Sequence, residues 1–108
     1  MDPDLTTEAL RVLSHSFGVA PKAALAHTGR PTLDDVRRFL VGHITELLDR
    51  NPGMLLSILY RVDVAEQDVK RVFSLAEPEH MALQLADLLI ERQLQKLRHW
   101  QQYRNRAS

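Results

Sequence analysis

The residues most able to do chemistry are cations and aromatic rings gathered at the end of the sequence. Residues 92–108 contain five lysine or arginine residues and no acid, although the whole chain has 14 basic and 14 acidic residues. Basic side chains neutralise phosphates, and aromatic rings stack on unpaired bases. The candidate residues for binding an anionic partner are therefore Lys96, Arg98, Trp100, Tyr103, Arg104 and Arg106.

Three interpretations of this basic segment stay open from the sequence. Cations near the carboxyl end of a helix complement the helix dipole and need no partner. That interpretation explains the charges, but it leaves Trp100 and Tyr103 only the role of covering core or dimer surface. The same segment could instead bind a single-stranded nucleic acid, or an anionic protein or lipid surface.

Other chemistry has little support in the residue spacing. His43 and Glu46 lie three residues apart on one expected helix, but carboxylate-bridged metal sites need the order Glu-x-x-His twice, with further glutamates. We therefore expect His43 to be an ordinary half-buried histidine. The serines lack a glycine-rich elbow, and the four glycines form no phosphate loop or dinucleotide fingerprint. The sequence predicts no catalytic residue, metal or cofactor, and hence no enzyme.

Size and composition favour a single domain over residues 1–108. The chain is 44% hydrophobic and 26% charged, close to the averages for globular proteins. It contains no cysteine, which excludes disulfides and is compatible with a reducing compartment. The first residues are acidic where a secretory signal would be basic, and no apolar run approaches the roughly 20 residues that span a bilayer. We expect a cytoplasmic protein without a membrane span.

The spacing of apolar residues predicts an all-α fold, a small bundle of about five helices with a long carboxyl-terminal helix. The first expected helix covers residues 5–17. Residues 18–31 contain two glycines and two prolines, so we expect a connecting loop in which residues 23–26 could hold one helical turn.

Capping residues predict where the next helices begin. Thr32 is a good N-cap for a helix over residues 33–49. The apolar face of that helix consists of Leu33, Val36, Leu40, Ile44, Leu47 and Leu48. Asn51 and Pro52 predict a stop and a new start, with Asn51 as the N-cap and Pro52 at the first helical position.

The helix that follows, through about residue 61, is apolar on all sides, so we expect it to be central and surrounded by the others. Asp63 with Glu66 resembles a capping box and predicts a helix over residues 64–75. These two short helices could also form a helix-turn-helix. The turn lacks a glycine, however, and the would-be recognition helix begins with Glu66 and Asp68, which disfavour DNA.

The last helix is expected to be unusually long. Residues 77–79 restart the chain, and a pattern without glycine or proline then runs from residue 81 to about residue 104; with the restart, it predicts a helix of roughly 26 residues, or about 39 Å. A domain of this size is only about 30 to 35 Å across. The end of the helix, with its basic tail over residues 99–108, must therefore project, fray or pack on a second subunit.

The apolar residues of this last helix fall on two nearly opposite faces. One face can pack on the core of the chain. The second face is the candidate dimer face, because two-fold dimers are the commonest soluble oligomers. Its residues are Leu83, Ile90, Leu94 and Leu97. The alternative is a bundle in which one chain wraps the whole helix.

Two runs in the second half of the chain carry a resemblance. Residues 55–66 read LLSILYRVDVAE, and residues 85–92 read LADLLIER. In these runs the chain resembles short uncharacterised bacterial proteins. The resemblance implies a small cytosolic all-α protein and supplies no activity, cofactor or site.

The function expected from these observations is that of a small non-enzymatic interaction or regulatory module acting as a homodimer. The alternative is a nucleic-acid-associated protein that uses its basic carboxyl-terminal end. Residues 1–91 hold all fourteen acids but only nine bases, so that part of the chain would repel a polyanion. Any contact with an anionic partner is therefore expected at the tail.

Overall fold

A computed structural model describes residues 5–19 and 31–107 of the chain. These residues form α-helices and no strand, which confirms the predicted all-α class and the long last helix. In chain order the helices are α1 (Leu5–Ser16), α3 (Leu33–Arg50), α4 (Pro52–Val62), α5 (Glu66–Leu75) and α6 (Pro78–Ala107). Gly18, in the left-handed conformation, follows α1. Residues 20–30, which hold most of the expected loop and its helical turn, lie outside the described residues.

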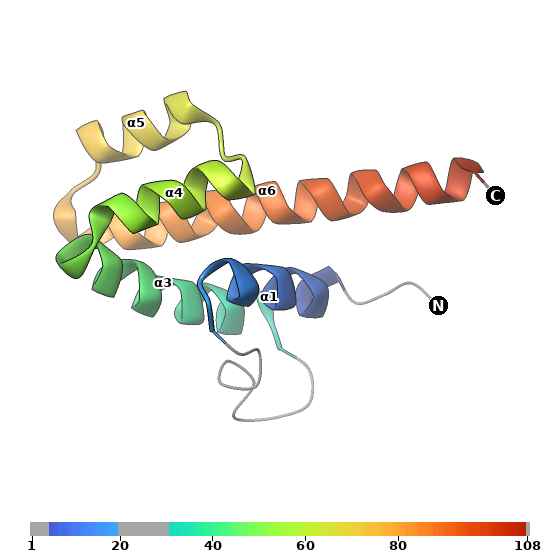
Figure 1. Ribbon diagram of the computed structural model, residues 1–108, viewed down its shortest axis with the longest axis horizontal. Coiled ribbons are helices and arrows are strands. Elements are labelled where there is room, and N and C mark those ends of the chain that lie inside the picture. Colours follow the sequence, from blue (N-terminus) through green and yellow to red (C-terminus); the bar gives the residue numbers. More distant parts are fainter. Residues whose placement is uncertain (1–4, 20–30, 108) are drawn as a thin grey trace.

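The central element of the fold is α6, which packs against α1, α3, α4 and α5. Figure 1 shows α6 along the long axis, with α1 and α3 below it, α5 above it and α4 drawn across it; α4 also contacts α1 and α3. A stripe of fully buried residues that includes Leu85, Ala86 and Leu89 runs along the inner side of α6. The core of the protein is therefore built around this helix.

The expectation that residues 54–61 form the central helix is wrong. The buried residues of α4 lie on one side and include Leu55, Ile58 and Leu59, whereas Met54 and Tyr60 are exposed. Packing covers α4 on only one side, and its second apolar side faces solvent. Apolar residues all round a short helix do not require that other helices surround it.

Local side-chain hydrogen bonds account for two of the predicted helix starts. The hydroxyl of Thr32 accepts from the backbone N–H of Asp35 at 3.1 Å, and the Asp35 carboxylate accepts from the N–H of Thr32 at 2.8 Å. The amide oxygen of Asn51 accepts from the N–H of Met54 at 3.2 Å, with Pro52 in the first turn of α4. Such caps satisfy N–H groups that a helix leaves without partners.

Leu33 departs from its expected place on the core face of α3. It is the first residue of the helix and is exposed, and the buried stripe of α3 begins with Val36 and continues with Leu40 and Ile44. The remaining predicted core residues, Leu47 and Leu48, are partly buried against the core.

The predicted capping box of Asp63 and Glu66 is also wrong. Asp63 ends α4 in the left-handed conformation, with φ of 70°, which aspartate tolerates better than most residues. The N-cap of α5 is instead Ala65, which makes no side-chain cap. The Asp63 carboxylate accepts from Nη2 of Arg92 at 2.8 Å, and the Asp63 carbonyl accepts from Nε of Arg92 at 2.9 Å. Arg92 of α6 therefore holds the turn between α4 and α5.

The candidate dimer face is not a free surface of α6. Ile90 and Leu94 are buried in the chain's own core, Leu97 is half-buried against that core, and only Leu83 is exposed. The expectation of a second, spare apolar face is wrong, because helices of the same chain cover it. Self-association itself stays a prediction, without this face to support it.

The carboxyl-terminal end of α6 projects, which was one of the three predicted outcomes. The helix has 30 residues, or about 45 Å of length, and the longest dimension of the molecule is 44 Å. Residues 98–106 are exposed except for Gln101, and the chain stays helical to Ala107. Across residues 5–19 and 31–107, no helix combines the length and the apolar character needed to cross a membrane.

Neighbouring residues of α4 provide a matched test of this packing. Leu59→Ala and Leu55→Ala each remove a fully buried side chain and should cost about 2 to 5 kcal/mol of unfolding free energy. Tyr60→Ala, at a position that is 53% exposed, should cost less than about 1 kcal/mol. Urea unfolding followed by circular dichroism measures both, and equal effects at positions 59 and 60 would show that α4 does not pack as described.

Candidate functional site

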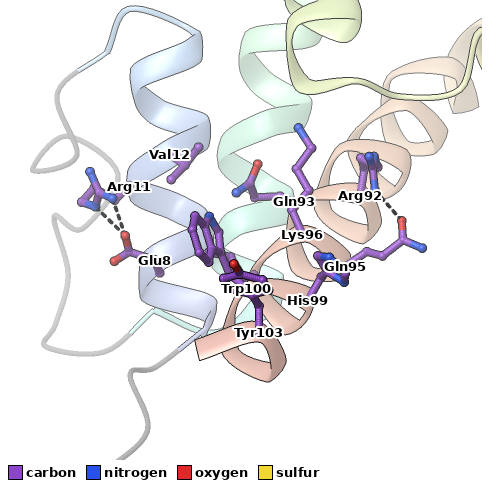
Figure 2. A pocket seen from close by; sticks show the side chains of 11 residues that line it. Glu8, Arg11, Val12, Arg92, Gln93, Gln95, Lys96, His99, Trp100 and Tyr103 are labelled. Carbon is purple, nitrogen blue, oxygen red and sulfur yellow. Dashed lines mark hydrogen bonds and ion pairs between the residues drawn. The ribbon is translucent and has the colours of Figure 1, made fainter. Parts of the chain in front are cut away.

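An open groove of about 980 Å³ lies between α1 and the carboxyl-terminal half of α6. We refer to it as the α1–α6 groove. Its lining residues are Glu8, Arg11 and Val12 from α1, and Arg92, Gln93, Gln95, Lys96, Leu97, His99, Trp100 and Tyr103 from α6. Figure 2 shows Trp100 and Gln93 between the ribbons of the two helices, with Arg11 and Glu8 on the α1 side.

The groove brings together three of the six candidate residues for an anionic partner. Lys96, Trp100 and Tyr103 line it, because residues spaced by four and three positions share one face of a helix. Arg98 is on a different face and lines a separate hollow with Asp63 and Asp68.

The other two candidates, Arg104 and Arg106, are exposed on the last turn and line neither hollow. The structure therefore divides the basic segment and does not gather it into one cationic patch.

Trp100 lies on the same stripe of α6 that forms the core further back. Ala86, Gln93 and Trp100 follow one another at intervals of seven residues, or about two helical turns, so they point in nearly the same direction. Ala86 is fully buried and Gln93 is 6% exposed, whereas Trp100 is 60% exposed. The core-facing side of α6 thus continues past its neighbours and becomes surface.

The two aromatic rings at this end contact each other. The ring centroids of Trp100 and Tyr103 are 5.9 Å apart, and the ring planes are at 75° to each other, an edge-to-face arrangement. Both rings are largely exposed. They therefore form a pre-arranged apolar surface that covers no core of the described chain.

The side-chain amide of Gln93 is the least satisfied polar group in the groove. It is almost wholly buried and lines the groove, and it makes no hydrogen bond to any described residue. Two turns further on, Nε2 of Gln101 is also buried without a partner in the described part of the chain. The amide of Gln93 reaches the open groove and is not committed to another described residue, so it is available to hydrogen-bond a bound group.

The charges of the groove are only partly neutralised. Arg11 pairs with Glu8 along α1, and Arg92 pairs with Asp63 at 2.8 Å. Lys96 forms no ion pair within the described residues, and burial, reinforced by the neighbouring Arg92, lowers the pKa of Lys96 below its ordinary value. Lys96 is therefore a half-buried cation without a direct ion pair, and the acid whose charge acts on it, Asp63, is already paired with Arg92.

Sequence reasoning missed the contribution of α1 and of Gln93. Nothing in the sequence indicates that Arg11 and Val12 lie beside the end of α6, because that contact depends on the tertiary packing of distant segments. Gln93 did carry a signal, since it is a polar residue in the middle of a stripe of core positions. An amide at such a position indicates a partner or a site.

The histidine that was considered as a metal ligand has an ordinary environment. His43 is half-buried, with its ring centroid 4.6 Å from that of Phe39 and 6.0 Å from that of Phe17, as expected. Glu46 pairs with Arg50 at 3.5 Å. Among the residues that the structure describes, no three potential metal-ligating side chains cluster.

Comparison with known proteins finds no matching family model, no matching curated protein and no matching solved structure. The function is therefore inferred from the groove itself.

The ion pair at the edge of the groove predicts a pH dependence of stability. The hydrogen bond from Arg92, with its positive charge, lowers the pKa of the Asp63 carboxyl group. A lowered carboxyl pKa in the folded state stabilises the fold above the unfolded value of about 3.9, and this contribution is lost as the pH falls through the lower folded value. Asp63→Asn, which keeps the left-handed turn, should be less stable than the parent at about pH 6.

The stability difference between parent and Asp63→Asn should shrink when urea unfolding is repeated at about pH 3. A difference of the same size at both values of pH would show that the charge of Asp63 does not contribute.

The unpaired lysine predicts a substitution that stabilises the protein. Lys96→Met keeps the apolar stem but removes a charge that burial and Arg92 disfavour, so it should raise the unfolding free energy by about 0.5 to 1 kcal/mol. Arg98→Met, at an exposed position on another face, should change it by less than about 0.5 kcal/mol. If urea unfolding shows Lys96→Met to be less stable than the parent protein, the charge of Lys96 stabilises the fold and is not held in reserve for a partner.

Proposed function

We propose that the protein is a non-enzymatic interaction module whose binding surface is the α1–α6 groove. One observation carries this proposal. The side of α6 that is core at Ala86 and Leu89 continues past the bundle to exposed Trp100, with the unbonded amide of Gln93 between them. A surface that continues a core in this way is complementary to another protein segment.

The contents of the groove suit binding better than catalysis. Large aromatic side chains such as Trp100 and Tyr103 dominate the energy of many protein interfaces, since they bury much apolar area with few rotatable bonds. No serine, threonine, cysteine or aspartate is among the described residues that line the groove. The groove thus supplies apolar contact, cations and an amide.

The same features lower the stability of the unbound protein. An exposed indole ring, an amide held in a mostly buried side chain without a protein hydrogen bond, and a half-buried lysine beside an arginine are each less favourable in the unbound state than in contact with a partner. A helix end that served only stability would not need them. A partner that covers Trp100 and bonds to Gln93 and Lys96 removes all three costs.

Binding of nucleic acid is the second candidate function, and one observation favours it. Within the described residues Lys96, Arg98, Arg104 and Arg106 form no ion pair. Against it, Arg98 lies on a different face from Lys96, and residues 1–91 carry five more acids than bases (14 against 9). A polyanion that followed the chain beyond the tail would meet repulsion.

Two further expectations belong to this proposal. A cytoplasmic location suits a chain without cysteine. Assembly as a homodimer would use exposed apolar residues outside the groove, such as Met54, Leu75 and Leu83.

A photo-crosslinking experiment separates these functions, with two exposed tyrosines as test and control. A photoreactive phenylalanine analogue in place of Tyr103, inside the groove, should give a discrete crosslinked protein band in cells. The same analogue in place of Tyr60, which is exposed on α4 outside the groove, should give none. Both positions are more than half exposed, so both variants should fold.

A crosslink from position 103 to nucleic acid, together with gel shifts that weaken as salt rises, would establish the second function and overturn the first. Equal crosslinking from positions 60 and 103 would show that the groove has no special role.

A further inference from the structure

We propose that the partner of the α1–α6 groove is an acidic amphipathic helix, which lies between α1 and α6 as a third packed helix. This inference rests on the proposed function of the groove and names the chemistry of its ligand. Four properties of the groove support it. They are the length of its α6 wall, its apolar surface, the absence of an ion pair to Lys96 and the absence of a hydrogen bond to the amide of Gln93.

The dimensions of the groove match a short helix. Its α6 wall runs from Arg92 to Tyr103, which is about 17 Å of helix, and its other wall is the single turn of α1 that carries Glu8, Arg11 and Val12, about 6 Å long. Two helices in contact leave a furrow between them into which a third can lay an apolar stripe. A partner helix of about three turns would fill this length.

The apolar part of the groove lies on one side of α6. Leu97 and Val12 are half-buried in it, and the edge-to-face pair of Trp100 and Tyr103 extends it outward. Apolar side chains at positions i, i+3 or i+4, and i+7 of a partner helix would contact this surface.

The charges select an acidic partner. Lys96 forms no direct ion pair within the described residues, the nearby Asp63 is already paired with Arg92, and α6 contains no acid after Glu91. The groove's own acid, Glu8, is already paired with Arg11. A carboxylate from a partner would supply the missing counter-ion, and hydrogen bonds to charged groups are the stronger ones.

Gln93 and Lys96 together define where that carboxylate would bind. They are three residues apart on α6 and line the same groove, so both donors can address one acid. The residue Gln93 is only 6% exposed and its amide makes no hydrogen bond to a described residue, so the amide atoms that reach the groove are available to a partner. This pair gives the site its preference for Asp or Glu over an uncharged residue.

A second copy of the chain fits this groove poorly. The projecting end of α6 in each copy carries the same cations and no acid. Two such ends in contact would bring like charges together without a counter-ion for Lys96, and like charges across an interface oppose association. Charge complementarity therefore favours a different, acidic segment.

Selection from a displayed library of helical peptides tests the inference without a known partner. The library would carry three-turn helices with randomised faces, and the full-length protein would be the bait. Selection should enrich Asp or Glu beside apolar residues spaced i, i+3 or i+4, and i+7. The Trp100→Ala, Tyr103→Ala double variant, which alters exposed residues only, should enrich no such pattern.

The most enriched peptide would then be titrated by calorimetry against single variants. Lys96→Met should weaken binding about tenfold, because it removes the cation that faces the carboxylate. Arg98→Met, on another face, should leave the affinity unchanged. Because Lys96→Met is expected to be the more stable protein, its loss of binding cannot be ascribed to unfolding.

Enrichment of basic or proline-containing peptides, or equal affinity of Lys96→Met and the parent, would overturn the acidic helix. So would a library from which nothing is enriched. After any of these three results, the proposed function would survive if the photoreactive analogue at position 103 still crosslinked to a protein. Both proposals would fall if it did not.

Discussion

The structure depends on the burial of one stripe of α6. Residues such as Leu85, Ala86 and Leu89 on this stripe are buried against the helices around α6, and apolar burial of this kind is the dominant favourable term in folding. The helix is longer than the layer that covers it. A single stripe is therefore core where neighbours cover it and surface at Trp100, where they end.

In this geometry the buried core and the proposed binding surface lie on the same helix but at different ends. Arg92 stands at the boundary, because it holds the turn at Asp63 and also lines the groove. On the amino-terminal side of Arg92, the inner face of α6 is apolar and buried in the core. On its carboxyl-terminal side lie the polar and charged groups, Gln93 and Lys96, whose requirements the described chain leaves unmet. These two groups are the basis for our proposal that the groove binds a partner.

Sequence reasoning succeeded where local chemistry decides the structure and failed where distant segments meet. The starts of α3 and α4 were predictable because Thr32 and Asn51 cap the residues next to them. The role of Asp63 was not, because its partner Arg92 is 29 residues away. The same limit explains why Ile90 was assigned to a free face. The grouping of Trp100 with Lys96 follows from helical spacing, but the groove also needs α1, which no local pattern places there.

The fluorescence of Trp100 tests the central claim most directly, because it is the one tryptophan of the chain. Our account predicts the red-shifted emission of an exposed indole in the free protein. The emission should be quenched by iodide and should not change with protein concentration. Blue-shifted emission that iodide cannot quench would show that Trp100 is covered without a partner, either by the chain itself or by a second copy. That result would contradict the claim that α6 ends in an open binding surface.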